Sequence, residues 1–132
     1  MEGAELIAEA LGRVNAILHR SLEGTPADML CRMPAPHANS MAWTAWHLTR
    51  VQDDHISDLA ELPELWTSAG WHTRFDMEPD DAETGQGHTF DEVAAFKVES
   101  AEVLLAYQDA VYERSKEYLA GLKPADLVRE LD

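Results

Sequence analysis

Apolar residues recur at steps of three and four along the first part of the chain, at Ile7, Leu11, Val14, Leu18 and Leu22. This spacing gathers them on one face of a helix with 3.6 residues per turn. The pattern therefore predicts an amphipathic helix over residues 3–22.

A short second element is indicated directly after this helix. Gly24 is a stop signal, because glycine readily ends helices. Thr25 is a suitable N-cap, and Pro26 is tolerated at a first helical position. We therefore expect a short helix that ends near Cys31.

A second long helix is expected from a cap at Asn39 or Ser40 to about Leu62, because Pro63 ends it. Trp43 and Trp46 lie off its apolar stripe and indicate a second contact surface. That surface could be a pocket, a dimer interface or, as we favour, the underside of a covering loop. The stripe expected to face inward is Met41, Ala45, Leu48, Val51, His55, Leu59 and Leu62.

Residues 67–90 lack clear periodicity, and so long a connection tends to be functional or mobile. Thr89 or Asp91 is expected to cap a third long helix over residues 91–121, with Gly121 as its stop signal. The final stretch, ADLVRELD, starts one more helix. The last segment, of about nine residues, spans roughly 13 Å at about 1.5 Å per residue and cannot match the long helices.

Three long amphipathic helices without strand alternation or repeats predict an all-α fold. We expect one domain over residues 1–132, an antiparallel bundle in which the fourth helix is short or missing.

Composition excludes several partners and suggests a compartment. The formal net charge of −15 repels phosphate, which argues against nucleic acid and anionic membranes as ligands. No run of about 18 apolar residues is present to span a membrane. A single cysteine and an acidic N-terminal stretch favour a cytoplasmic protein.

The histidines are the first candidates for chemistry. His47 and His55 share the second long helix but stand eight residues, or about 12 Å, apart, so they cannot share one zinc-type ion. His47 lies at the edge of the stripe, where it is either a boundary histidine or a ligand that acts with residues of other helices. We interpret His55 as a core or near-core histidine bonded to Asp58.

Other candidates have more ordinary interpretations. The acidic residues of 76–87 resemble a calcium loop, but Asp81 stands where glycine is needed and Gly87 where a glutamate is needed. We therefore expect a solvated loop. Cys31 could be a nucleophile near His37, although a lone cysteine is more often a buried small side chain.

The stretch NSMAWTAWHLTRVQDDH, residues 39–55, resembles the second-helix motif of DinB-like proteins. The likeness is closest to the actinobacterial branch near the thiol-dependent S-transferases and maleylpyruvate isomerases. The matching residues are Asn39, Ser40, Trp43, Trp46, His47, Leu48, Arg50, Val51 and Asp53.

The resemblance implies a four-helix bundle that holds a divalent metal such as zinc, nickel or iron. It implies His47 as one ligand, and a low-molecular-weight thiol such as mycothiol that reacts with a small electrophile. The family's other two ligands usually come from an HxxxH or ExxxH pair on the last long helix. No such pair follows His47 in this sequence.

Three explanations of that departure stay open. The sequence is a piece of a longer product, a partner chain supplies the missing ligands, or the protein is a metal-free member. A short fourth helix would expose an apolar groove, which favours a homodimer. The sequence thus supports two hypotheses: a metal-dependent thiol transferase or isomerase, and a metal-free helical binding or dimerisation module.

Overall fold

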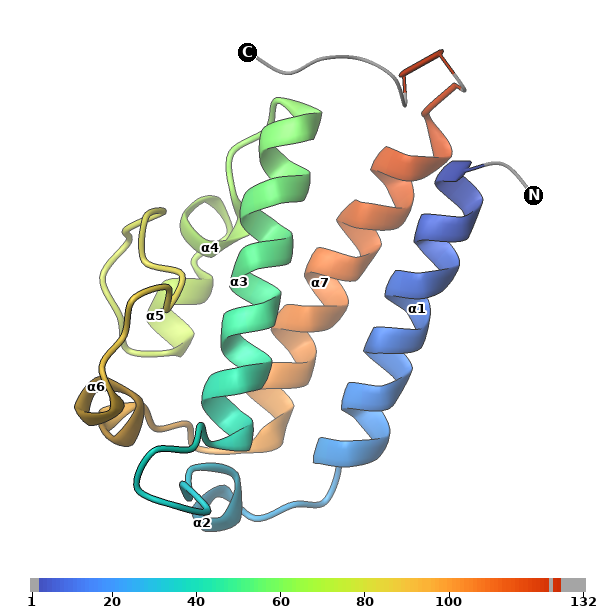
Figure 1. Ribbon diagram of the computed structural model, residues 1–132. Coiled ribbons are helices and arrows are strands. Elements are labelled where there is room, and N and C mark those ends of the chain that lie inside the picture. The colour runs from blue at the N-terminus through green and yellow to red at the C-terminus, as the bar shows by residue number, and fades with distance from the viewer. Residues whose placement is uncertain (1–2, 124, 127–132) are drawn as a thin grey trace.

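The computed structural model describes residues 3–123 and 125–126, and over these it contains seven helices and no strand. Three helices are long and four are short (Figure 1). The long helices are α1 (Gly3–Leu22), α3 (Met41–Ala60) and α7 (Ala101–Ala120). The short ones are α2 (Ala27–Leu30), α4 (Leu65–Ser68), α5 (Trp71–Arg74) and α6 (Phe90–Ala95). The predicted all-α class is confirmed.

The long helices form a bundle in which α7 lies between α1 and α3 and packs against both (Figure 1). Helix α1 is antiparallel to the other two. Helices α3 and α7 run in the same direction, because the chain returns along the outer side of α3 through α4, α5 and α6. We call residues 64–98, which make this return, the covering segment.

Local signals set both ends of α3, and the N-terminal end is as predicted. Ser40 is its N-cap, and the Ser40 hydroxyl oxygen accepts a hydrogen bond of 3.0 Å from the backbone nitrogen of Trp43. At the other end, Glu61 adopts a left-handed conformation with φ of 58°. The Leu62 nitrogen then bonds the Ser57 carbonyl at 2.9 Å, which closes the helix two residues earlier than expected.

The inward stripe predicted for α3 is only partly correct: Ala45 is buried, but Met41, His55 and Leu62 are exposed. Met41 and Leu62 are 42% and 48% exposed, whereas Trp46, Arg50 and Asp53 are fully buried. The physical reason is that the covering segment packs on the face that holds the tryptophans. Its polar groups pair with those of α3, so this face did not need to be apolar.

The expected third long helix, residues 91–121, is two helices. Thr89 caps α6 with a capping box that Glu92 completes, as the sequence indicated. The helix then stops at Phe96, which has an extended conformation with ψ of 121°, and α7 begins five residues later. Burial of Phe96 against Trp46, with ring centroids 4.9 Å apart, accounts for the break. Periodicity alone could not show it.

Two smaller predictions also have clear outcomes. Thr25 is not the N-cap of α2: the cap position is Pro26, and the Thr25 hydroxyl donates to the Ser21 carbonyl instead. The final helix predicted in ADLVRELD lies almost wholly outside the described residues. Within the described residues, no helix is long and apolar enough to cross a membrane.

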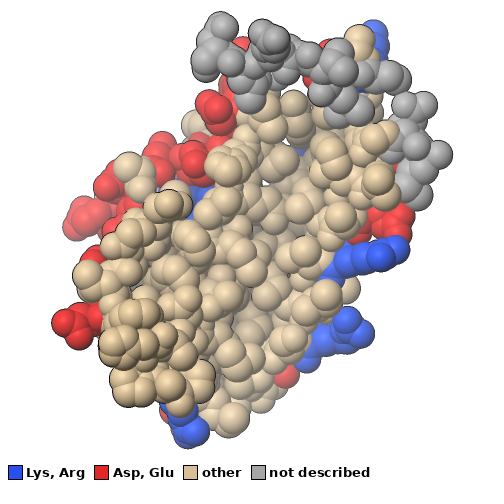
Figure 2. All heavy atoms as spheres, viewed as in Figure 1, with Lys and Arg blue, Asp and Glu red and all other residues tan. Residues whose placement is uncertain are grey.

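The aromatic core lies at the flank of the bundle, between α3, α7 and the covering segment. Its fully buried members include Trp46, Trp66 and Tyr107. By contrast, part of the apolar stripe of α1 is uncovered: Ile7 and Val14 are 45% and 37% exposed. Figure 2 shows the same contrast, because the face over the long helices is mostly uncharged and acidic side chains gather at the edge over the covering segment.

Candidate functional site

His47, the predicted metal ligand, is held in one orientation by the covering segment. Its Nδ1 atom lies 2.5 Å from the Thr84 carbonyl oxygen, and its ring stacks on the Trp43 ring with centroids 4.7 Å apart. A carbonyl oxygen can only accept, so Nδ1 carries the proton and donates. In the neutral ring, Nε2 therefore keeps its lone pair, and it has no hydrogen bond with the described residues.

This orientation suits a metal ligand. Histidines that bind metals usually donate their other ring N–H to a carboxylate or a backbone carbonyl, which fixes the tautomer and the ring plane. Thr84 supplies such an acceptor to His47. A boundary histidine would be satisfied by the same hydrogen bond, so the geometry is compatible with either role.

Gly85 allows the covering segment to approach His47 so closely. Its φ is +90°, a conformation that side chains rarely adopt. A Cβ atom at this position would lie 2.8 Å from the Trp46 ring, 3.0 Å from the Trp43 ring and 3.1 Å from His47 Nδ1. The lack of periodicity in residues 67–90 does not single out Gly85. Its contacts depend on the tertiary fold.

His55 is not a core histidine, and that prediction is wrong. Its side chain is 71% exposed, and its nearest charged partner is the Asp54 carboxylate at 3.9 Å rather than Asp58. His55 lies nine positions after Trp46 on α3, which places its side chain half a turn around the helix axis from the buried face.

The remaining candidates from the sequence do not converge on a site. Cys31 is buried, and its sulfur accepts a hydrogen bond from the Val98 nitrogen at 3.4 Å. The His37 ring packs on Phe90 instead of Cys31. His72 bonds the carbonyl oxygen of Met77 at 2.9 Å. The structure thus supports the ordinary interpretation of Cys31.

A complete metal centre is not formed within the described chain. Over residues 3–123 and 125–126, no three side chains of His, Cys, Asp or Glu come together in a way that could hold an ion. These residues fit one ligand position, that of His47, and not a whole site.

His88 of the covering segment contacts Trp43, the residue on which the His47 ring stacks. The Trp43 indole nitrogen donates to His88 Nδ1 at 3.1 Å, and His88 Nε2 lies 2.8 Å from a Glu83 carboxylate oxygen. An indole N–H can only donate, so Nδ1 accepts and Nε2 carries the proton. The Trp43 side chain thus contacts both histidines.

Arg50 joins α3 to the acidic part of the covering segment. Its guanidinium is fully buried and donates to the carbonyl oxygens of Glu83 and Asp81, both at 2.9 Å. It also donates to the Glu64 carboxylate at 2.7 Å and lies over the Trp66 ring, 4.8 Å from the centroid. These bonds hold the segment that carries Thr84.

Asp53 fixes the start of α4 in a similar way. One oxygen accepts from the Leu65 nitrogen at 3.0 Å, and the other accepts from the Trp66 nitrogen at 2.8 Å and the Tyr107 hydroxyl at 2.7 Å. Such carboxylate bonds satisfy donors that the first turn of a helix leaves free.

Arg50, Asp53, Glu64 and Tyr107 form a buried cluster, here called the Arg50 cluster, and burial is the main cause of the pKa shifts of Glu64 and Tyr107. Burial raises the pKa of Glu64 to about 7, against the opposing effect of Arg50. Burial and the neighbouring Asp53 raise the pKa of the Tyr107 hydroxyl above its ordinary value, so it stays a donor. Arg50 Nη1 lies 3.7 Å from an Asp53 carboxylate oxygen and 2.7 Å from a Glu64 carboxylate oxygen, so a single guanidinium serves both carboxylates.

The motif that carries the family resemblance therefore has a structural explanation. Ser40 caps α3, and Trp43, His47, Arg50 and Asp53 each bind a group of the covering segment. The motif residues fold this segment onto α3 and orient His47.

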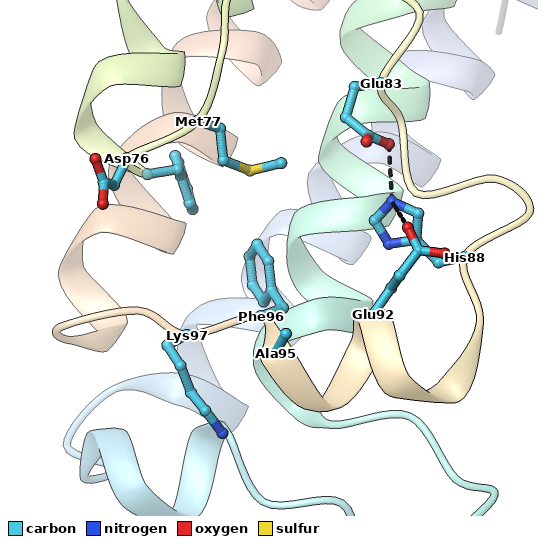
Figure 3. Close-up of a pocket in the computed structure, with 9 residues that line it drawn as sticks. Asp76, Met77, Glu83, His88, Glu92, Ala95, Phe96 and Lys97 are labelled. Carbon is cyan, nitrogen blue, oxygen red and sulfur yellow. Dashed lines mark hydrogen bonds and ion pairs between the residues drawn. The ribbon is translucent and has the colours of Figure 1, made fainter.

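A cavity of about 400 Å³ opens beside His88 and Glu83 of the covering segment (Figure 3). Apolar side chains form its floor and one wall, and carboxylates and His88 form another. Its lining residues are Phe75, Asp76, Met77, Glu83, His88, Glu92, Ala95, Phe96 and Lys97.

The fold and the site define a helical-bundle protein whose second long helix holds one histidine in a fixed orientation. Comparison with known proteins identifies the family. The chain belongs to the DinB superfamily, whose family model matches residues 10–132. A solved structure of a conserved protein from Enterococcus faecalis is similar, with a TM-score of 0.85 and 30% sequence identity. The match covers 95% of this chain and 74% of that one. A search of curated proteins found no match.

Proposed function

We propose that the protein is a divalent-metal-dependent transferase or isomerase of the thiol-using kind, and that His47 is one of its metal ligands. The observation that carries the proposal is the hydrogen bond from His47 Nδ1 to the Thr84 carbonyl oxygen. It leaves Nε2 as the atom that can bind zinc, nickel or iron.

The other ligands would come from outside the described residues, either from a second chain or from parts of the protein that the structure does not describe. The co-substrate would be a low-molecular-weight thiol such as mycothiol, and the second substrate a small electrophile. The membership of the DinB superfamily supports this proposal. The assignment to the actinobacterial branch and the cytoplasmic location stay predictions.

The first test is the ratio of metal to protein, by elemental analysis of protein purified without chelators or a histidine tag. His47→Ala is compared with His55→Ala, a matched control on the same helix whose side chain is exposed. We expect near-stoichiometric metal in wild type and in the control, and little in His47→Ala with unchanged helicity. Metal retained in His47→Ala, or absent from wild type, would contradict the proposal.

A second test measures thiol transfer. Wild type, His47→Ala and His55→Ala are incubated with mycothiol and a fluorogenic alkylating electrophile, and the adduct is quantified. We expect adduct formation to be lost in His47→Ala alone. Equal rates of adduct formation in all three proteins would show that the activity does not require His47 and would contradict the proposal.

A second candidate function is a metal-free module for binding or dimerisation, and the uncovered face of α1 favours it. Leu6 and Ile17 on this face are 60% and 50% exposed, beside Ile7 and Val14. Figure 2 shows few charges over the long helices, although the whole chain carries −15. Large exposed apolar patches often mark interaction surfaces.

Sedimentation velocity tests this second candidate. We expect a concentration-dependent homodimer that Ile17→Lys disrupts. Ala16→Lys adds the same charge one residue away, about 130° from the centre of the apolar patch, and should leave the dimer intact. A monomer at all concentrations would remove the candidate.

A further inference from the structure

The cavity in Figure 3 has the general character of a small-molecule site. Ligand pockets are commonly about 300–1,000 Å³ and mostly apolar, with a few polar groups that fix orientation. Here the volume is about 400 Å³. Phe96 and Ala95 lie between the two polar sides of the cavity, and Met77 faces them from the opposite loop. An apolar body would be covered on several sides.

One end of the cavity is acidic and partly unsatisfied. Glu83 and Glu92 both lie near the same atom, His88 Nε2, at 2.8 and 3.8 Å. Glu83 uses only Oε1 for the fold, whereas Glu92 uses Oε1 and its Oε2 is the atom 3.8 Å from His88 Nε2. Glu83 Oε1 also accepts from the Gly85 nitrogen, and Glu92 Oε1 accepts from the Thr89 nitrogen. The second oxygen of each carboxylate makes no hydrogen bond with the described residues.

The charge at this end is not balanced by the surrounding walls. The Trp43 indole N–H donates to His88 Nδ1, so the opposite side of the ring, Nε2, faces the two carboxylates. Among the described lining residues the formal cation is Lys97, and Figure 3 shows its ammonium turned away from the two carboxylates. The hydrogen bond from the Thr89 backbone lowers the pKa of Glu92, which keeps that group ionised.

We propose that this cavity binds a small organic cation, namely an alkylammonium group attached to an aromatic or other apolar body. The ammonium would donate to the free oxygens of Glu83 and Glu92, and the apolar body would pack on Phe96, Phe75 and Met77. This inference goes beyond the metal-dependent function and does not depend on it, since none of these groups is His47.

The test is calorimetric titration of metal-stripped wild-type protein with phenethylamine. 2-Phenylethanol has the same shape without the charge, and 3-phenylpropionate reverses the charge. A charge-assisted hydrogen bond predicts that the amine binds at least about tenfold more tightly than the alcohol. The anion should not bind detectably. Equal affinities of amine and alcohol, or no binding of the amine, would overturn the proposal.

Variants locate the binding site. Glu83→Gln and Glu92→Gln keep an acceptor oxygen, and glutamine also completes a capping box, so both should fold. We expect the double variant to lose at least about tenfold in affinity for phenethylamine. Glu78→Gln removes the same charge from the same segment outside the cavity and should have no effect. If Glu78→Gln lost as much affinity for phenethylamine as the double variant does, the effect would be one of overall charge, and the assignment to this cavity would be overturned.

A spectroscopic readout gives the place of binding directly. The Trp43 indole N–H, assigned with Trp43→Phe, donates to His88 on the cavity wall. Its peak in a ¹H–¹⁵N correlation spectrum of the wild-type protein should shift as phenethylamine is added, and it should not shift with 3-phenylpropionate. An unmoved signal during saturable binding would place the ligand elsewhere and overturn the proposal.

Discussion

Replacing Gly85 by alanine is the most direct perturbation of the contact between the covering segment and α3. The new methyl group would meet the Trp46 and Trp43 rings at 2.8 and 3.0 Å, and His47 Nδ1 at 3.1 Å. The residue would also have to hold a φ of +90°. Both effects act against the native position of Thr84.

The magnitude follows from these two costs. Holding an alanine in a left-handed conformation costs about 1–2 kcal/mol. Overpacking against rigid side chains costs about 1–3 kcal/mol. We therefore expect Gly85→Ala to lower the free energy of unfolding by about 2–5 kcal/mol, a large fraction of the roughly 5–15 kcal/mol of an ordinary domain.

The assay is urea denaturation followed by tryptophan fluorescence, with Gly87→Ala as the matched control. Gly87 has a φ of +82° in the same segment, but a Cβ there meets nothing within 4 Å. The control should therefore show the backbone cost alone. Equal losses in the two variants would refute the role assigned to close packing at Gly85.

Two further predictions concern the buried Arg50 cluster. The pKa of Glu64 is raised from 4.5 to about 7, so the native state binds this proton more tightly than the unfolded state does. The resulting stability is present below pH 4.5 and is lost as pH rises through 7, at most about 3 kcal/mol. Glu64→Gln should flatten this part of the pH profile in urea denaturation, whereas Glu78→Gln should leave it as in wild type; a wild-type slope in Glu64→Gln would contradict the assignment. Arg50→Met should lower the free energy of unfolding by about 3–5 kcal/mol, because it leaves Asp53 buried without its cation. A free energy of unfolding from thermal denaturation that lies within about 1 kcal/mol of the wild-type value would refute that account.

Signals local to the chain were predictable from the sequence. The helix over residues 3–22 and the Ser40 cap depend on residues within one or two helical turns, and both agree with the structure. The same holds for Thr89, whose capping box closes over three residues. The three long amphipathic patterns predicted the bundle, and the family resemblance pointed to His47.

Long-range pairing explains what the sequence could not show. Arg50 and Asp53 look like surface residues of an amphipathic helix, but backbone groups 12 to 33 residues away satisfy them. Their burial moved the core face of α3 away from the apolar stripe and left His55 exposed. The tautomer of His47 likewise depends on Thr84, 37 residues further on.

The proposal that His47 offers Nε2 to a metal is tested most directly by long-range ¹H–¹⁵N NMR of the histidine ring in metal-free protein, before and after zinc is added. The account predicts that His47 is protonated at Nδ1 and not at Nε2, and that zinc shifts the Nε2 resonance while Nδ1 keeps its proton. A ring protonated at Nε2, or an Nε2 resonance that zinc leaves unchanged, would contradict it.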